Sequence, residues 1–152
     1  MISVIQRVIQ AKVTVSGEDI GNIGQGILAL VAVEKSDTPL QADRLLERIL
    51  NYRIFADVNG KMNLCLRDIQ GGLLLVHQFT LAADTCKGNR PSFASAAAPQ
   101  LGLDLFGYLQ QKALSVYPST QFGLFGADMK VALINDGPVT FTLRASQNQN
   151  RL

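Results

Sequence analysis

Histidine, cysteine and tryptophan are scarce in this chain of 152 residues: it has one histidine (His77), two cysteines (Cys65 and Cys86) and no tryptophan. A structural zinc site takes four Cys or His ligands, so the usual zinc centres are excluded and we expect no metal or other cofactor. A Ser-His-Asp or Cys-His catalytic site would have to use His77. Two isolated cysteines are typical of a reducing cytoplasm, and the sequence leaves a disulfide between them open.

An excess of charge of one sign is also missing. The 14 Lys and Arg residues nearly balance the 12 Asp and Glu residues, which gives a formal net charge of +2. This balance is too mild to indicate a nucleic-acid-binding domain, and it does not exclude one. The densest basic segment is Lys87-Gly88-Asn89-Arg90, which is either a solvated turn or a loop that contacts phosphate.

Long hydrophobic runs are absent as well. The longest one, residues 27–33, is far shorter than the roughly 20 residues that cross a membrane. The first 15 residues carry Arg7 and Lys12 and lack a cleavage site, so we expect a cytoplasmic protein with no membrane partner. The length and the apolar content of 47% predict a single domain, residues 1–144, followed by a polar, frayed tail, residues 145–152.

The hydrophobic periodicity predicts an α/β domain with about two helices and seven or more strands. The first helix begins at Thr38, where Pro39 and Gln41 complete a capping-box pattern. Because the strands do not alternate regularly with helices, a simple doubly wound fold is disfavoured. The predicted helices are residues 39–51 and 99–117, the predicted strands are 2–15, 27–33, 52–55, 61–66, 73–79, 129–134 and 139–143, and turns or a short hairpin are predicted at 17–26 and at Asn59-Gly60.

Two polar strand ends are where chemistry could sit, because ligands of open α/β sheets gather beyond the carboxyl ends of strands. The first is the run His77-Gln78-Phe79-Thr80, where the Thr80 hydroxyl and two successive free N–H groups could hold a developing oxyanion. The second runs from Asn135 to Thr140, between two predicted strands. Spacing alone favours ordinary interpretations: a Thr80 that satisfies its own turn, and an Asn-Asp-Gly-Pro turn with the usual trans X–Pro bond.

The spacing of His77, Phe125 and Met129 favours a structural role for these side chains over a catalytic or binding role. His77 shares one face of its strand with Leu75 and Phe79, which is typical of a core or rim histidine rather than a catalytic one. No acid or nucleophile stands at a fixed spacing from it. Phe125 and Met129 are more typical of a core than of a ligand pocket.

Taken together, the two strand ends resemble the signatures of the D-aminoacyl-tRNA deacylase family. The signature Asn-x-Gly-Pro-Val-Thr is intact at residues 135–140, whereas Ser-Gln-Phe-Thr appears at residues 77–80 with its leading Ser replaced by His77. The resemblance covers about residues 1–144. The matching segments are MISVIQRV, GNIGQGILALVAVEKSD, YRIFADVNGKMNL, QFTLAADTCKGNRPSF and FGADMKVALINDGPVTF.

This resemblance implies a fold, an activity and a partner. The fold is a three-layer α/β/β arrangement found as a homodimer. The activity is hydrolysis of the ester that joins a D-amino acid, or glycine, to the terminal adenosine of tRNA, which is a proofreading step in translation that needs no cofactor. Gly137 and Pro138, joined by a cis peptide in the family, would reach the partner subunit's active site and reject L-amino acids, and Arg7 would steady their loop.

The resemblance also places the catalytic site at the first signature. The backbone N–H groups of Phe79 and Thr80 are expected to bind the aminoacyl group and stabilise the oxyanion, with His77 and Gln78 beside them. Either the Thr80 hydroxyl acts as a nucleophile or the 2′-hydroxyl of the tRNA ribose activates water. We favour the second, because an unassisted Thr hydroxyl is a weak nucleophile. The positions that match the family's adenine pocket are Phe125 and Met129.

His77 in place of the family Ser leaves an alternative function open. The larger side chain could crowd the substrate or hold a water differently, so the chain could be a tRNA-acceptor-binding module with reduced or lost activity. An editing protein of the same fold that acts on L-amino acids is a third reading, and the Gly-Pro-Val-Thr signature argues against it.

Overall fold

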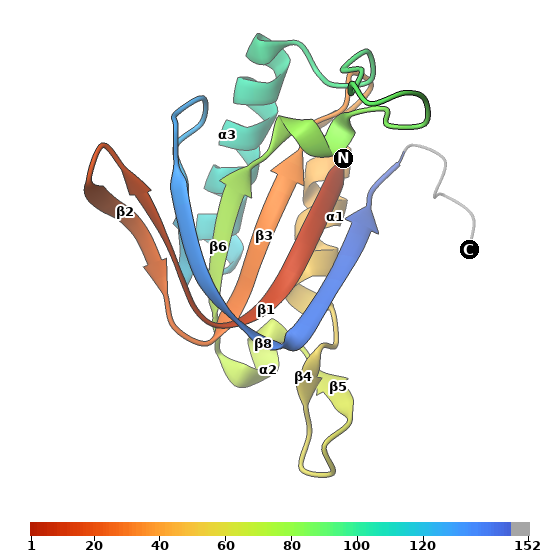
Figure 1. The fold of residues 1–152 in the computed structure, drawn as a ribbon. Helices are drawn as coiled ribbons and strands as arrows, with labels where there is room; N and C mark the ends of the chain where they lie inside the picture. The colour runs from red at the N-terminus through yellow and green to blue at the C-terminus, as the bar shows by residue number, and fades with distance from the viewer. Residues whose placement is uncertain (147–152) are drawn as a thin grey trace.

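The computed structural model describes residues 1–146, which form eight strands and three α-helices (Figure 1). The strands are β1 (Ile2–Val15), β2 (Glu18–Ile23), β3 (Gly26–Ala32), β4 (Phe55–Ala56), β5 (Met62–Leu64), β6 (Gly72–His77), β7 (Thr120–Phe122) and β8 (Lys130–Arg144). The helices are α1 (Pro39–Asn51), α2 (Leu66–Ile69) and α3 (Pro99–Val116), with a short 3₁₀ helix, η1 (Phe79–Ala82), after β6.

The main sheet has the strand order β2-β1-β3-β6-β7, and β8 pairs with β1. Strand β1 pairs along its first half with β3 and along its second half with β2, while β8 follows it through both halves. The pairs β3–β6 and β6–β7 are parallel, and the pairs made by β1 are antiparallel. Since β1 and β8 both bend, the sheet curls back on itself and is nearly closed (Figure 1).

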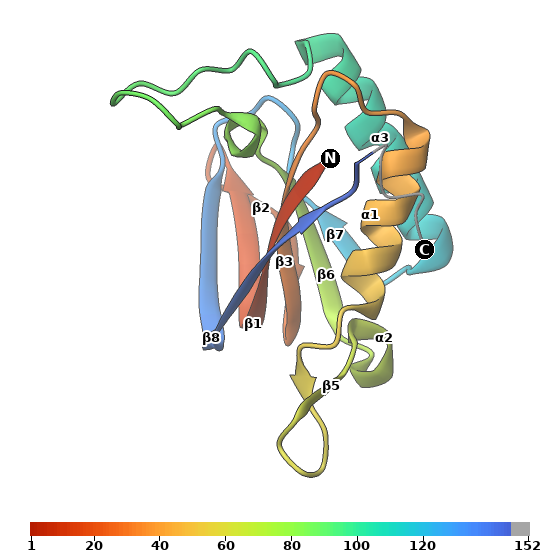
Figure 2. The ribbon, with the colours of Figure 1, turned by 90° about the vertical axis from the view of Figure 1, so that its right-hand side faces the viewer.

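Two separate apolar clusters divide the domain into three layers. Strands β3 and β6 are apolar at nearly every position, and their side chains alternate between the two clusters. Leu73 and Leu75 pack against the helices, whereas Leu74 and Val76 pack against the curled part of the sheet. Figure 2 shows α1 and α3 covering one face of the sheet, with β1, β2 and β8 on the other side. The predicted α/β/β class is therefore confirmed.

Helix α1 begins and ends at the predicted residues. The Thr38 amide and hydroxyl both donate to Gln41 Oε1, at 2.9 and 2.7 Å, which satisfies part of the helix terminus. The apolar residues at helical spacing are buried against the sheet: Ala42, Leu45, Leu46, Ile49 and Leu50. The local capping signal was sufficient here, because the helix needs no distant partner to define its start.

Several predicted strands are wrong in extent. The predicted strands 129–134 and 139–143 are one strand, β8, because β1 pairs with both halves and spans the motif between them. The predicted strand 61–66 is only β5, since Cys65 starts the short helix α2. The predicted strand 73–79 ends at His77, so Phe79 leaves the strand face and lies in η1. The strand at 52–55 is reduced to β4, and β7, three residues long, was not predicted.

The two ends of the described chain meet beside the β3–α1 connection. The amino group of Met1 is buried and donates to Asp37 Oδ1 at 2.6 Å, to Glu34 Oε2 at 3.0 Å and to the Ala145 carbonyl at 2.9 Å. Ala145 is therefore buried rather than part of a frayed tail, while residues 147–152 lie outside the described residues. Cys65 and Cys86 are free thiols, so they form no disulfide with each other. Within residues 1–146, no helix is both long and apolar enough to cross a membrane.

Candidate functional site

The carboxyl end of β6 opens into two adjoining hollows, of about 220 and 290 Å³. His77, Phe79 and Gly126 line both of them. The first hollow is completed by Val33, Ala97, Ala98, Pro99, Gly102 and Phe125, and the second by Val76, Gln78, Ala127, Asp128, Met129 and Val131. The first predicted motif therefore lies at a cavity formed by β6, the start of α3 and the β7–β8 connection.

His77 is held among aromatic rings on the helical side of the sheet. Its imidazole lies 4.3 Å from the Phe125 ring, centroid to centroid, and 5.4 Å edge-on from Phe106. Partial burial in this apolar environment lowers the pKa of His77, because the charged imidazolium is poorly solvated there. The histidine is therefore neutral at pH 7 and forms an aromatic wall between the hollows, which agrees with the rim position expected from its strand face.

The backbone turns sharply immediately after His77. The Gln78 amide still donates to the Val31 carbonyl of β3 at 2.7 Å, and the Leu81 amide donates to the Gln78 carbonyl at 3.2 Å. Within residues 1–146, the amides of Phe79 and Thr80 have no such backbone acceptor, because they are the first residues of a 3₁₀ helix. Two successive N–H donors are thus free, one on Phe79, which lines both hollows, and one on the residue that follows it. The Gln78 side chain donates to the Thr80 hydroxyl.

Phe125 and Met129 come from the β7–β8 connection and line different hollows. Phe125 stacks on His77, whereas Met129 Sδ accepts a hydrogen bond from the Leu124 amide at 3.3 Å. Both line a hollow, and both also pack at the margin of an apolar cluster, so each is part of the core and part of a cavity wall. Gly126, with φ of +76°, makes the turn between them.

Sequence reasoning from the residues alone missed most of the cavity walls. They are small or apolar residues, such as Ala97, Ala98 and Gly102, which carry no chemical signature. Among the walls, Gly126 had a signal of another kind, because it lies in FGADMKVALINDGPVTF, a segment that carries the family resemblance.

The second motif forms a wide bulge in β8. Between Gln6 and Val8 the strand β1 advances two residues, whereas β8 advances five, from Thr140 to Asn135. The Gly137-Pro138 peptide, which is cis, lies in this bulge, and Gly137 has φ of +139°, a conformation that L side chains rarely adopt. The trans turn that spacing alone favoured is therefore wrong, and the bulge presents the Gly-Pro peptide at the edge of the domain.

Arg7 anchors the bulge to the rest of the domain. Its Nε donates to the Asp136 carbonyl at 2.9 Å, its Nη1 donates to the Ile54 carbonyl at 2.6 Å, and Nε lies 3.4 Å from Asp136 Oδ2. The side chain is only 15% exposed. Hydrogen bonds from a charged donor to two carbonyls are stronger than neutral ones, so the arginine fixes the bulge relative to the α1–β4 junction.

Within one chain, the two motifs lie far apart. The strand register places Val8 beside Asn135 and Gly26, and Gly26 beside Gly72, at the start of β6. His77 is five residues further along β6, which is about 16 Å at 3.3 Å per residue. Figure 1 shows the bend of β8 at the opposite end of the sheet from the tip of β6. A chain's own Gly137-Pro138 therefore does not line its own hollows.

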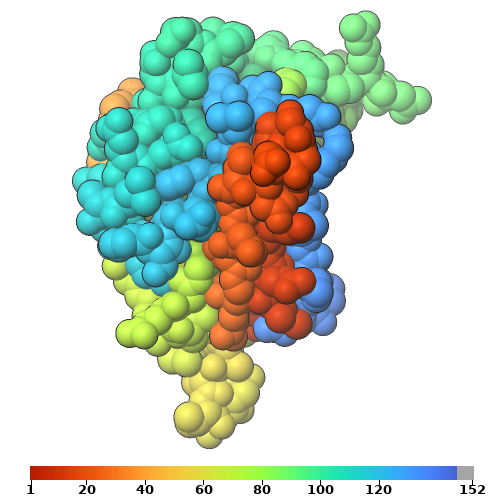
Figure 3. Space-filling view, turned by 90° about the vertical axis from the view of Figure 1, so that its left-hand side faces the viewer, coloured from red at the N-terminus to blue at the C-terminus, as the bar shows by residue number. Residues whose placement is uncertain are grey.

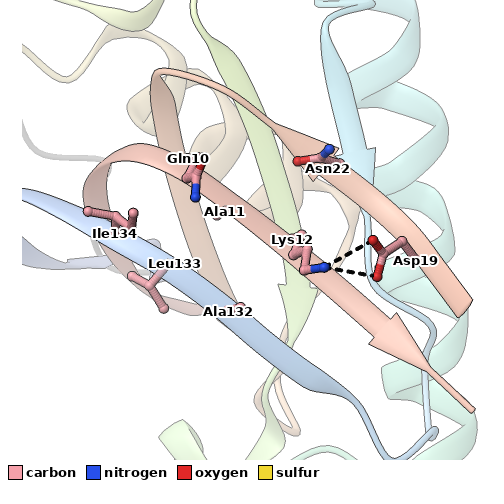
Figure 4. A pocket seen from close by; sticks show the side chains of 8 residues that line it. All are labelled: Gln10, Ala11, Lys12, Asp19, Asn22, Ala132, Leu133 and Ile134. Carbon is pink, nitrogen blue, oxygen red and sulfur yellow. Dashed lines mark hydrogen bonds and ion pairs between the residues drawn. The ribbon is translucent and has the colours of Figure 1, made fainter. Parts of the chain in front are cut away.

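Another groove lies elsewhere on the domain and lacks catalytic chemistry. It has a volume of about 310 Å³ and lies across β1, β2 and β8 (Figure 4). Its charged groups are the exposed pair Lys12 and Asp19, whose Nζ and Oδ2 are 3.1 Å apart. The residues that line it are Gln10, Ala11, Lys12, Asp19, Asn22, Ala132, Leu133 and Ile134. Nowhere in residues 1–146 do three or more His, Cys, Asp or Glu side chains form a group that could hold a metal ion.

A family described as "D-Tyr-tRNA(Tyr) deacylase" matches residues 4–144 of the chain. The chain belongs to this family. A protein named D-aminoacyl-tRNA deacylase from Pseudomonas entomophila (strain L48) is 60% identical over 144 residues, which cover 95% of this chain and 99% of the relative. A protein of the same name from Nitrosococcus oceani is 58% identical over 95% of this chain and 93% of the relative.

Solved structures related to the family have the same fold. A protein described as "c-Myc DNA Unwinding Element Binding Protein" matches with a TM-score of 0.91 and 37% identity, over 96% of this chain and 99% of that one. A probable eukaryotic D-amino acid tRNA deacylase matches with a TM-score of 0.83 over 93% of this chain and 97% of that one. Its 15% identity shows that the three-layer architecture persists where most of the sequence has changed.

The environment of His77 predicts how the stability of the protein depends on pH. Because folding lowers the pKa of this group from 6.5, the unfolded chain binds its proton at a higher pH than the native chain. The free energy of unfolding should therefore fall as the pH falls through 6.5, and His77→Gln should flatten this decline. As the single histidine, His77 gives imidazole NMR signals that report its pKa directly. A midpoint at or above 6.5 in the folded protein would contradict the burial effect.

Proposed function

We propose that this protein hydrolyses the ester of D-aminoacyl-tRNA, releasing the D-amino acid and tRNA. The observation that carries the proposal is the pair of hollows around Phe79, with two free backbone donors at their mouth, in a chain that belongs to the deacylase family. Relatives at about 60% identity bear the name D-aminoacyl-tRNA deacylase. The reaction is an ester hydrolysis, so it needs an oxyanion site and an activated water but no electron carrier.

In the proposed reaction, water attacks the carbonyl carbon of the ester. The electrons of the C=O bond move to oxygen, where the amides of Phe79 and Thr80 stabilise the negative charge. When the carbonyl re-forms, the bond to the ribose oxygen breaks and that oxygen takes up the proton lost by water. Backbone donors of this kind do not depend on side-chain identity, so one site can serve many D-amino acids and glycine. The rings of Phe79 and Phe125, with Met129, would enclose the terminal adenine.

We assign the activation of water to the 2′-hydroxyl of the substrate's ribose rather than to Thr80. The Thr80 hydroxyl already accepts a hydrogen bond from Gln78, and in residues 1–146 no His, Lys or carboxylate side chain hydrogen-bonds it. The neutral His77 ring is engaged in aromatic contacts. A Thr hydroxyl without a neighbouring base is a poor nucleophile, which supports the substrate-assisted route.

Chiral selection is assigned to a second copy of the chain. Gly137-Pro138 lies about 16 Å along the sheet from the hollows of its own chain, and the Arg7-anchored bulge holds the peptide at the edge of the domain. A two-fold dimer would bring the bulge of each subunit to the hollows of the other, because a two-fold interface pairs unlike patches reciprocally. Rigid backbone placed against Cα of the substrate would exclude an L side chain by contact.

The remaining expectations follow from this function. Residues 1–144 form the single catalytic domain, and the protein acts in the cytoplasm, where charged tRNA is used. The binding-only alternative would require His77 to block the site. That ring lines the hollows without filling them, which favours an active enzyme over a binding module.

The activity is tested by presenting the purified protein with tRNA charged with D-tyrosine, L-tyrosine or glycine. We expect rapid release of D-tyrosine and glycine and at least a hundredfold slower release of L-tyrosine, because the L side chain would meet rigid backbone; this preference corresponds to about 3 kcal/mol. One oxyanion donor is worth about 10²–10³ in rate, so hydrolysis by the protein should be clearly faster than hydrolysis of the same substrate without protein. Hydrolysis of the L form alone would overturn the proposed function.

The cross-subunit arrangement is tested by sedimentation together with assays of mixed subunits. Gly137→Ala places a Cβ 2.8 Å from Val139 Cγ2 at a backbone conformation that disfavours it, so the bulge of this variant should misplace the Gly-Pro peptide. We expect the protein to sediment as a dimer. We expect Gly137→Ala to hydrolyse L-tyrosyl-tRNA, which the unaltered protein rejects. A monomer that retains D-specific hydrolysis would contradict the arrangement.

His77→Ser tests whether the histidine takes part in catalysis or selection. Within residues 1–146 the imidazole makes ring contacts and no side-chain hydrogen bond, so the variant should keep its preference for D over L substrates, with kcat/KM changed by less than about tenfold. Phe106→Leu, which alters the edge-on packing against the imidazole, serves as the control. Complete loss of D-selectivity in His77→Ser would show that the ring participates in the chiral check.

A further inference from the structure

Residues 84–92, which we call the arm, project from the domain beside the candidate site. The Asp84 and Ser92 backbones close the arm at its base through two hydrogen bonds, of 2.8 and 3.0 Å. Figures 2 and 3 show this segment, in green, extending beyond the helices and sheets. Both ends of the arm return to the site, because η1 precedes it and the walls at Ala97 and Ala98 follow it.

The tip of the arm is basic and its charges are unneutralised. Lys87 and Arg90 lie in a run without an acidic residue, and both are exposed. Lys35 lies at the base, where its amide donates to the Ser95 carbonyl at 3.2 Å. Across the described residues, none of these three cations forms an ion pair. The carboxylate of Asp84, the one acidic residue of the arm, accepts a hydrogen bond from the Cys86 amide at 2.9 Å.

An exposed aromatic pair connects the arm to the hollows. Phe93, the residue after the arm, stacks against Phe79 with 5.1 Å between ring centroids. These side chains are 41% and 50% exposed, although each has enough apolar surface to be buried. Phe79 also lines both hollows, so an aromatic surface runs from the site to the foot of the basic tip.

We propose that the arm and Phe93 bind the single-stranded nucleotides that precede the terminal adenosine of the tRNA substrate. This inference rests on the proposed function, which places the terminal adenosine in the hollows beside Phe79. Sites for single-stranded nucleic acid combine cations that contact phosphates with aromatic rings on which bases stack. Here Lys87 and Arg90 contact the phosphates, and Phe93 stacks a base.

The arm is tested by comparing two substrates, D-tyrosyl-tRNA and the D-tyrosyl ester of adenosine. The adenosine ester fills the hollows but lacks the preceding nucleotides. We expect Lys87→Ala and Arg90→Ala each to raise KM for the tRNA. Each should also lower the slope of log KM against the logarithm of the salt concentration by about 0.7, and the double variant should lower this slope by about 1.4. Phe93→Ala should raise KM for the tRNA about tenfold. For the Lys87 and Arg90 variants, the kinetics with the adenosine ester should stay within twofold of the unaltered protein.

Lys112→Ala removes a cation of α3 that pairs with Asp43 of α1 at 3.8 Å, and it is the control, with no expected change in salt dependence. An unchanged KM for tRNA in the double variant, or an equal loss on both substrates, would overturn the inference. If the protein hydrolyses neither substrate, the proposed function fails. Titration with uncharged tRNA then tests the role of the arm separately. A higher Kd for the double variant than for the unaltered protein supports this role, and an equal Kd overturns it.

Discussion

Strand β1 is hydrogen-bonded along both edges, and the rest of the domain depends on this double pairing. It joins β3 and then β2 on one edge and β8 on the other, so a single strand serves the central sheet and the curled layer. The same pairing fixes the position of the β8 bulge, since Gln6 and Val8 set where β8 must leave and rejoin the ladder. The geometry of the Gly-Pro peptide is therefore a property of the whole sheet and not of a local turn.

The site divides its tasks between backbone and side chains. Backbone donors at Phe79 and Thr80 are positioned by the end of a buried strand, and Arg7 positions the Gly-Pro peptide through carbonyl oxygens. Side chains supply the aromatic walls, of which His77 is one. A site of this kind would let a chain whose single histidine serves as an aromatic wall support ester hydrolysis.

The sequence predicted the parts of the fold that are determined locally. Helix α1 followed from Thr38 and Gln41, and the two-sided burial of β3 followed from its continuous apolar run. Prediction failed where distant pairing decides the outcome. Strand β7 has only three residues, too few to show the alternation of apolar and polar side chains that predicts a strand. The Asn-Asp-Gly-Pro run resembles a loop unless β1 is known to pair with β8 on both sides of it. The two strand ends were singled out from the residues, but their functional roles came only from the family resemblance, because spacing alone favoured ordinary turns.

Strand β6 is embedded in both apolar clusters, with Leu73 and Leu75 on one side and Leu74 and Val76 on the other. The backbone that leaves it at His77 is thus fixed from two directions. The walls of the hollows come instead from connections such as Gly126 and from the segment that leads into α3. Substitutions in these connections would therefore reshape the hollows without displacing the free amides of Phe79 and Thr80.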